Sequence, residues 1–392
     1  MTLTNKQQEG LNIAVARYKA KERWTCISGY AGSGKTTLVR FIIDALQVNP
    51  EEDVAYIAFT GKAAQVLRQK GCPNAMTAHR LLYYSKPTPS GRFIYTPRPS
   101  IPYKIVVVDE VSMLSKELWD LLLSHPVYVI ACGDPGQLPP VSKDSCLDIL
   151  NHPHVFLDEI MRQAQESEII RLSMDIREGR PIAFMKGKEV QVIPGGELVG
   201  GMYVWADQIL VATNNKRIQV NNEMRAAANR GPHPEIGDKI ICNRNCWDIS
   251  DTDEVHALVN GTIGYITNIN EIDYQYPHYQ LRDPVPLFQT SFKTEYDAEF
   301  IDVPIDQSSI LNNTKFLTPQ QEYLFFKSQQ LKMEPMPIEF NYGYAITCHR
   351  SQGSQWDKVL VLEERFPFEA EDHKRWLYTA VTRAADKLVL VR

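Results

Sequence analysis

The sequence lacks the features that would take it out of the ordinary globular proteins. None of its apolar runs reaches the roughly 18 residues that a membrane-spanning helix needs. The first seven residues are polar and carry no apolar core of a signal peptide, so we expect no export leader and no membrane partner. With 392 residues, 44% of them hydrophobic and 23% charged, the chain is predicted to form two or three soluble domains.

Paired cysteines are also absent. The chain has seven cysteines, an odd number without a disulfide spacing, which favours reduced thiols and a cytoplasmic location. Cys242 and Cys246 stand four apart, but no second cysteine or histidine pair completes a zinc site.

An excess of positive charge is missing as well. The 42 lysines and arginines face 47 acidic residues, so the net charge is −5. Any nucleic-acid binding must therefore come from a local groove, because affinity depends on the phosphates that are actually contacted. No carboxylate cluster of a nuclease is visible either.

The strongest positive signal is a glycine-rich turn. Residues 29–37 read Gly-Tyr-Ala-Gly-Ser-Gly-Lys-Thr-Thr, between an apolar run typical of a buried strand (24–27) and a helical pattern (38–46). In this context backbone N–H groups and the helix N-terminus bind phosphate, Lys35 reaches the β- and γ-phosphates, and Thr36 holds Mg²⁺. We therefore expect ATP and Mg²⁺ as cofactors, with these loop residues in contact with the nucleotide: Gly32, Ser33, Gly34, Lys35, Thr36 and Thr37.

Acidic and amide groups follow two further predicted strands. The valine-rich run 105–108 predicts a central parallel strand, which ends in Asp109 and Glu110. Asp109 is a candidate Mg²⁺ ligand and Glu110 a candidate general base; a solvated strand end is the alternative. After a strand at 127–132, Gln137 is expected beside the γ-phosphate. Gln7, upstream, offers an amide to an adenine edge; a solvated helix glutamine is the alternative.

Polar groups also open two predicted helices. Thr60 and Lys62 begin one, after a strand at 54–59, and Thr77 and His79 begin another. Such junctions suit the phosphates of a nucleic-acid backbone, although each is equally an ordinary helix cap.

A segment rich in proline and aromatic residues, at 83–104, interrupts the α/β pattern. We expect a small hairpin there. Its side chains Phe93 and Tyr95 are candidates to stack on bases or to wedge into a duplex; the alternative is a loop that packs its own aromatics.

The order of these motifs resembles that of superfamily 1 DNA helicases. The sequence is similar to the RecD-like and Dda-like branch, and its compactness is nearer to the phage type. The resemblance rests on seven motifs, which lie at residues 29–37, 60–64, 109–112, 133–141, 157–163, 344–355 and 378–384.

This resemblance implies a fold of two tandem RecA-like parallel-sheet α/β domains. The first would cover residues 1–165, with the hairpin insertion at about 83–104. Residues 166–236 would form a linker and the start of the second domain. Residues 237–340 would form an SH3-like β-barrel insertion, and residues 341–392 the remainder of the second domain.

The resemblance also implies roles for residues that spacing alone does not assign. Arg162 and Arg383 would reach the γ-phosphate from across the cleft, and the backbone of Gly353 would meet it. Thr347 and His349 would contact DNA from the second domain. Family members commonly have proline where this chain has Phe59, which leaves open how that corner contacts bases.

The activity implied is that of a monomeric 5′-to-3′ DNA translocase and helicase in replication or recombination, acting on single-stranded and forked duplex DNA. Single-strand-binding or replication proteins are the expected partners. Two alternatives remain: a DNA-stimulated ATPase that remodels protein–DNA complexes without unwinding, and a RecD-like motor subunit of a nuclease complex.

Overall fold

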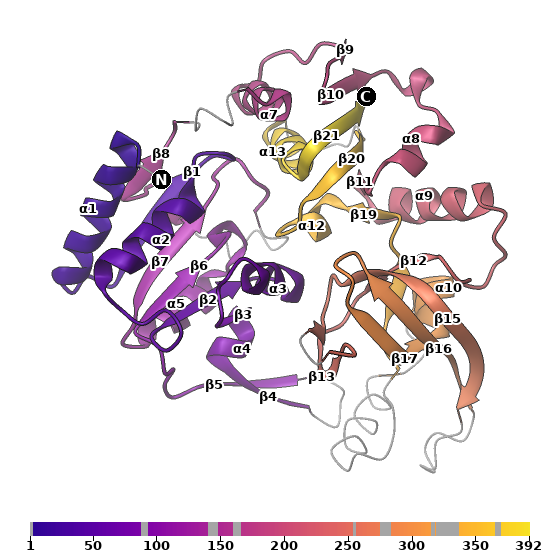
Figure 1. The fold of residues 1–392 in the computed structure, drawn as a ribbon, viewed down its shortest axis with the longest axis horizontal. Helices are drawn as coiled ribbons and strands as arrows, with labels where there is room; N and C mark the ends of the chain where they lie inside the picture. The colour runs from indigo at the N-terminus through magenta and orange to yellow at the C-terminus, as the bar shows by residue number, and fades with distance from the viewer. Residues whose placement is uncertain are drawn as a thin grey trace. The chain divides into compact units, whose positions relative to one another are not determined.

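Parallel strands dominate the first of the two units into which the chain divides (Figure 1). This unit comprises Met1–Leu82, Arg98–Asn214 and Ile346–Arg392, and the second comprises Tyr83–Pro97 and Asn215–Ala345. The computed structural model describes residues 3–87, 93–139, 148–159, 166–253, 256–274, 284–314, 318, 337–364 and 370–392.

The first sheet has the strand order β3-β2-β6-β7-β1-β8, and all of its strands are parallel. Parallel strands buried on both faces need near-continuous apolar sequence, which explains the run of valines in β6. The strands are β1 (Trp24–Gly29), β2 (Val54–Ala58), β3 (Ala75–Thr77), β6 (Ile105–Val108), β7 (Tyr128–Gly133) and β8 (Val155–Leu157). The helices are α1 (Asn5–Lys19), α2 (Lys35–Leu46), α3 (Gly61–Gln69), α4 (Ala78–Leu82) and α5 (Lys116–Ser124).

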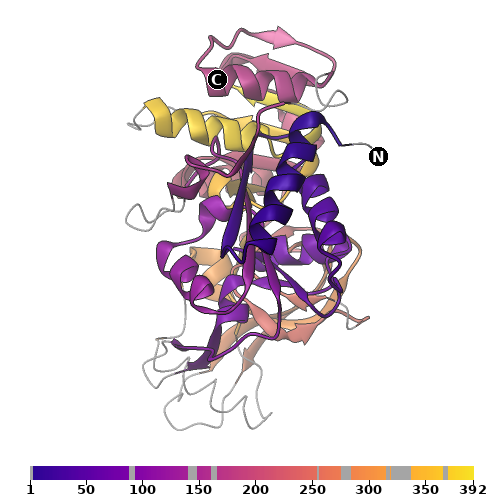
Figure 2. The ribbon, with the colours of Figure 1, turned by 90° about the vertical axis from the view of Figure 1, so that its left-hand side faces the viewer.

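Helices α1 and α2 cover one face of this sheet. Figure 2 shows the indigo α1 beside the chain's N-terminal label, running along the strands. Its Ala14 joins Leu38 and Ile42 of α2 in one apolar core with Ile27 of β1 and Ile130 of β7. Because the strands are buried on both faces, polar side chains such as Asp109 come directly after their carboxyl ends.

The second sheet has the order β19-β11-β20-β21-β10-β9, with only β9 paired antiparallel to its neighbour among the pairs the structure describes. The expected α/β class with two parallel sheets in tandem is thus confirmed. The strands are β9 (Met185–Lys186), β10 (Val190–Ile193), β11 (Gln208–Val211), β19 (Ala345–Thr347), β20 (Trp356–Leu362) and β21 (Ala384–Val391). The helices are α7 (Glu168–Glu178), α8 (Gly200–Trp205), α12 (Cys348–Ser351) and α13 (Ala370–Val381). Helix α9 (Asn214–Ala227) follows β11 and belongs to the second unit from Asn215 onward.

The second unit is built on an antiparallel sheet of order β17-β16-β15-β12-β18. Its core stacks the rings of Phe292 and Phe300, with Phe340 edge-on to Phe292. The strands are β12 (Lys239–Cys242), β15 (Ile263–Tyr274), β16 (Val285–Thr294), β17 (Glu299–Asp306) and β18 (Phe340–Tyr342). The unit also holds α10 (Gln307–Asn312) and the strand pairs β13 (Cys246–Ser250) with β14 (Ala257–Leu258) and β4 (Tyr83–Pro87) with β5 (Phe93–Pro97).

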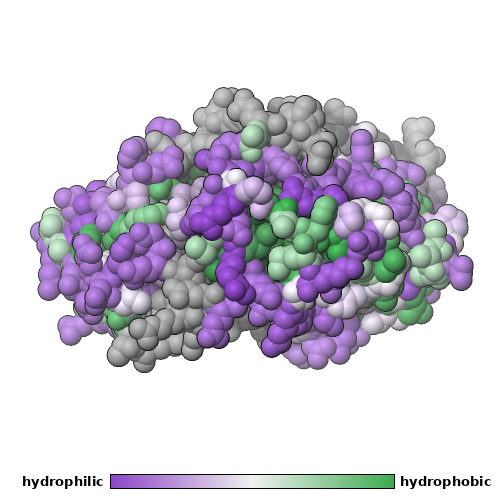
Figure 3. Space-filling view, turned by 90° about the horizontal axis from the view of Figure 1, so that it is seen from above, coloured by the Kyte–Doolittle hydropathy of each residue, from purple (hydrophilic) through white to green (hydrophobic). Residues whose placement is uncertain are grey.

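The face in Figure 3 is mostly hydrophilic, with apolar groups scattered among the polar ones. Scattered exposed apolar side chains are normal for folded proteins. Within the described ranges, no helix combines the length and the apolar character needed to cross a bilayer. The six described cysteines are buried free thiols.

Candidate nucleotide-binding site

The glycine-rich turn lies between β1 and α2, as the sequence predicts. Gly32 and Gly34 have φ angles of 77° and 79°, a left-handed conformation that side chains with a Cβ rarely adopt. Helix α2 begins at Lys35 directly after them, so its N-terminal N–H groups and partial positive charge face the loop. Ser33 closes the loop by donating its hydroxyl to the Tyr30 carbonyl at 2.8 Å.

Lys35 is held by its own loop. Its Nζ donates to the carbonyl oxygens of Gly29 at 2.7 Å and Tyr30 at 3.0 Å. Thr36 and Thr37 lie in the first turn of α2, with Thr36 exposed and Thr37 half-buried. After the carboxyl end of β1, the loop therefore offers the Lys35 ammonium, the Thr36 hydroxyl and backbone N–H groups.

Asp109 lies at the carboxyl end of β6 and accepts a hydrogen bond from the Glu110 N–H at 3.1 Å. Burial raises the pKa of its carboxyl, and the charge of Lys35 opposes this shift. The half-buried Asp109 carboxylate and a threonine hydroxyl are hard oxygen donors that fit Mg²⁺. The described residues hold no cluster of three His, Cys, Asp or Glu side chains.

Glu110 faces a residue from the far end of the chain. Its Oε1 lies 3.6 Å from a guanidinium nitrogen of Arg383. Burial raises the pKa of the Glu110 carboxyl, and Arg383 opposes the shift. The backbone of Glu110 has a φ of 51°, a strained conformation that is found more often at functional sites than elsewhere.

Arg383 and Gly353 bring the second sheet to this carboxylate. Arg383 is 5% exposed, and its guanidinium donates to the carbonyls of Thr379 at 3.1 Å and Ser354 at 3.3 Å. A Cβ on Gly353 would lie 2.5 Å from the Cβ of Ala63 and 3.7 Å from Glu110 Oε2. Only glycine permits so close an approach, and its φ of 77° has the same requirement.

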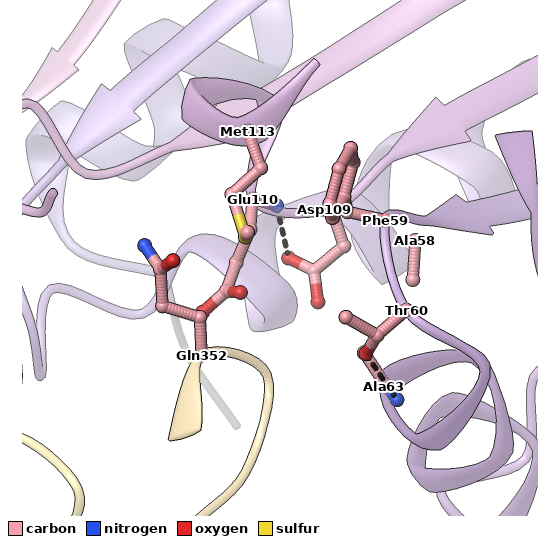
Figure 4. A pocket seen from close by; sticks show the side chains of 8 residues that line it. All are labelled: Ala58, Phe59, Thr60, Ala63, Asp109, Glu110, Met113 and Gln352. Atoms are coloured by element: carbon pink, nitrogen blue, oxygen red, sulfur yellow. Dashed lines mark hydrogen bonds between the residues drawn. The ribbon is translucent and has the colours of Figure 1, made fainter. Parts of the chain in front are cut away.

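Two glutamine amides near this site have oxygen atoms without a hydrogen-bond partner. Within the described ranges, Oε1 of Gln137 and Oε1 of Gln352 are buried and unpaired. Gln352 lines a pocket with Asp109, Glu110 and Thr60, and Figure 4 shows its side chain opposite Glu110. Since buried acceptors are rarely left unpaired, these oxygens indicate a place for water or a ligand.

Gln7 lies next to the glycine-rich turn of residues 29–37, which we call the phosphate loop, but its amide forms hydrogen bonds within the protein. Its Oε1 accepts from Thr4 N–H at 3.0 Å, as part of a capping box that starts α1. Its Nε2 approaches the carbonyls of Ser33 at 3.4 Å and Gly34 at 3.5 Å. Recognition of adenine by Gln7 stays a prediction.

The residues predicted to contact DNA from the first sheet also have roles in the fold. Thr60 accepts from Ala63 N–H at 3.1 Å and so caps α3, and Thr77 accepts from Arg80 N–H at 3.3 Å before α4. Lys62 places its ammonium 4.8 Å from the centre of the Trp356 ring, a cation–π contact. The helix-cap alternative is therefore present in the structure, and a DNA contact remains compatible with it.

The two candidate histidines share one electrostatic property. Burial lowers the pKa of His79 and of His349, so both imidazoles are neutral at pH 7. As DNA contacts they would act through hydrogen bonds and not through charge. Thr347 is 8% exposed and precedes α12, on which His349 lies.

The remaining predicted residues lie elsewhere. Phe93 begins β5 and Tyr95 lies within it; the Tyr95 ring is 48% exposed and packs edge-on against Tyr83 at 5.7 Å. Both belong to the second unit. Arg162 lies outside the described residues.

Sequence reasoning assigned no role to Tyr378, Asp134 or Gln352. The Tyr378 hydroxyl donates to Asp134 Oδ2 at 2.6 Å, and both side chains are buried. All three lie inside motifs used for the resemblance, so the signal was present, but a motif does not say which of its side chains meet.

The comparisons with known proteins agree with this geometry. Residues 2–196 match a family model described as an AAA domain, and residues 342–391 match one described as a UvrD-like helicase C-terminal domain. The ATP-dependent RecD2 DNA helicase of Deinococcus radiodurans is 26% identical over 97% of this chain and 49% of its own length. By these matches the chain is similar to RecD-like and Dda-like DNA helicases.

Two further relatives show how much of the chain is similar in sequence and in fold. The ATP-dependent DNA helicase dda of Enterobacteria phage T4 is 29% identical over 45% of this chain and 43% of its own length. A crystal structure of Pif1 helicase from Bacteroides, in complex with ADP-AlF3 and single-stranded DNA, matches with a TM-score of 0.56 at 17% identity, over 100% of this chain and 92% of that one. That likeness shows the tandem RecA-like fold. The chain spans about half the length of the curated helicases it matches.

Proposed function

We propose that this chain is an ATP-dependent DNA helicase that couples ATP hydrolysis between its two parallel sheets to movement along single-stranded DNA. The observation that supports this most is the pairing of Arg383 with Glu110 at 3.6 Å. A residue that follows α13 of the second sheet thereby meets the acidic group that follows β6 of the first. Such a contact gives hydrolysis a way to change how the two sheets pack.

The nucleotide would sit on the phosphate loop, with its phosphates on Lys35 and the N–H groups of Gly32 to Thr37. Gln7 would contact the adenine. Mg²⁺, held by Thr36 and Asp109, would supply charge neutralisation of the β- and γ-phosphates.

Hydrolysis would use four side chains and one backbone group around the γ-phosphate. Glu110 would accept the proton of the attacking water, and Gln137 would orient that water through its unpaired amide oxygen. Arg383, with Arg162 and the Gly353 backbone, would stabilise charge on the transferring phosphoryl group. Arginines in this role raise the rate by about 10³–10⁵ in related NTPases.

DNA would bind to helix starts and motifs outside residues 29–37. The contacts would come from Thr60, Lys62, Thr77, His79, Thr347 and His349. Release of Lys62 from the Trp356 ring would free its charge for a phosphate. The β4–β5 hairpin, with Phe93 and Tyr95, would separate the strands, and the five-stranded sheet would act as an SH3-like insertion.

The finer parts of the proposal are a 5′-to-3′ direction and action as a monomer, with single-strand-binding or replication proteins as partners. An assay with forked duplexes tailed on either strand tests the direction. We expect ATP-dependent strand release with a 5′ tail only, and no release by the Lys35→Ala variant, which should still fold and bind single strands.

Other results in this assay would revise the proposal. Release from a 3′ tail alone would reverse the direction. DNA-stimulated hydrolysis without strand release would favour a translocase that remodels protein–DNA complexes. Hydrolysis by Lys35→Ala at the wild-type rate would refute the nucleotide site.

A further inference from the structure

One buried hydroxyl joins three segments around the phosphate loop. Tyr378 of α13 is 1% exposed; its hydroxyl accepts from the Ala31 N–H at 3.1 Å and donates to Asp134 Oδ2 at 2.6 Å. The other oxygen of Asp134 accepts from Gly136 N–H at 2.9 Å. The helix that precedes Arg383 is therefore bonded directly to the loop that would hold the phosphates.

The loop peptide that Tyr378 contacts is held at its other end by Lys35. The peptide unit between Tyr30 and Ala31 offers its N–H to Tyr378, while its carbonyl accepts from Lys35 Nζ at 3.0 Å and from Ser33 Oγ at 2.8 Å. Because a peptide unit is planar, rotating its carbonyl also rotates its N–H. If Lys35 leaves this carbonyl for a phosphate and the peptide unit rotates, the hydrogen bond from Ala31 N–H to the Tyr378 hydroxyl changes as well.

A second contact links α7 to the side chain of Tyr30. The guanidinium of Arg177, on α7, lies 3.6 Å from the centre of the Tyr30 ring, and α7 packs on α13.

Burial, followed by the charge of Asp134, raises the pKa of Tyr378, so the hydroxyl keeps its proton and its bond to Asp134 across the physiological range.

We propose that Tyr378 is a positioning residue for ATP hydrolysis, which sets Arg383 against the phosphate loop by bonding α13 to Ala31 and Asp134. This inference rests on the proposed function. Tyr378 would not touch the reacting atoms. It would align the arginine that follows five residues later with the γ-phosphate, and it would transmit the state of the loop to the second sheet.

The test compares Tyr378→Phe with Tyr128→Phe. Tyr128 is also buried and its hydroxyl also makes two hydrogen bonds, to Thr25 Oγ1 at 2.5 Å and the Ala14 carbonyl at 2.9 Å, but none to the phosphate loop. Two readouts are needed: hydrogen exchange of the peptide covering residues 29–37 without nucleotide, and steady-state ATP hydrolysis with single-stranded DNA.

For Tyr378→Phe we expect loop exchange to become about tenfold faster and kcat to fall about tenfold, the effect of losing one hydrogen bond, with little change in KM for ATP. Tyr128→Phe should change neither. Unchanged exchange, unchanged kcat, or equal effects in both variants would overturn the inference. If the wild-type chain hydrolyses no ATP, the proposed function fails, and the exchange readout still reports separately whether the Tyr378–Ala31 bond exists.

Discussion

Two ion pairs, one in each unit, differ in burial and in how completely their groups are hydrogen-bonded. In the second unit Asp238 is fully buried and bonds Arg225 at 3.2 Å, Arg230 at 3.1 Å, the Tyr344 hydroxyl at 2.8 Å and the Glu235 N–H at 2.7 Å. In the first unit Glu110 lies 3.6 Å from Arg383, and it lines a pocket together with Gln352, whose amide oxygen has no hydrogen-bond partner.

We interpret the Asp238 pair as structural and propose that the Glu110–Arg383 pair is functional. A buried carboxylate with every lone pair used is held in one geometry, and removing it leaves uncompensated charges. A loosely paired carboxylate beside unpaired acceptors has room for another ligand. We therefore expect changes at the first pair to cost activity and changes at the second to cost stability.

Arg383→Ala should show the largest effect. We expect ATP hydrolysis with single-stranded DNA to fall about 10³–10⁵-fold, because the variant would lose the guanidinium proposed to stabilise charge on the transferring phosphoryl group. Arg375→Ala is the matched control: this arginine lies on α13, the helix that precedes Arg383, and pairs with Glu371 at 3.6 Å. A loss in Arg375→Ala as large as that in Arg383→Ala would mean that both act through helix stability.

Asp238→Ala tests the other pair. We expect the free energy of unfolding to fall by about 3–5 kcal/mol, since Arg225 is left buried without its partner. Denaturant unfolding measures this loss, and binding of a fluorescent ATP analogue should persist, because none of the predicted nucleotide contacts lies in the second unit. Loss of nucleotide binding from a variant that is still folded would break the comparison.

Gly353→Ala sharpens the comparison at the first pair. A Cβ there would lie 2.5 Å from the Ala63 Cβ, and the φ of 77° is unfavourable for alanine. We therefore expect the free energy of unfolding to fall by about 2 kcal/mol, partly through backbone strain and partly because the segment moves away from Glu110. Hydrolysis should fall together with thermal stability. As a control, Gly179→Ala has a similar φ of 70° but no atom within 4 Å, so it should show the strain alone and keep its activity.

Much of this site could be predicted from sequence because it depends on local pattern. The phosphate loop of Lys35 and the strand before Asp109 are fixed by residues close to them in the chain, and the structure has both where the pattern places them. The contact of Tyr378 with Ala31 spans 347 residues, and only the fold brings the two together. The sequence also did not predict the partners of Asp238. Three of the four, Arg225, Arg230 and Glu235, precede it closely, but they belong to no recognisable motif.

The smallest effect is expected where side chains are exposed and belong to neither pair. Tyr95 on β5 is 48% exposed, and the pairing of β4 with β5 holds the hairpin through its backbone. Changing Phe93 and Tyr95 to Ala should therefore leave stability and DNA-stimulated hydrolysis near wild type and slow strand release by a few-fold, because stacking on bases is worth about 1–3 kcal/mol per ring. Forked-duplex unwinding and ATPase activity are measured on the same preparation. An equal loss of both would assign these rings to DNA binding and not to strand separation.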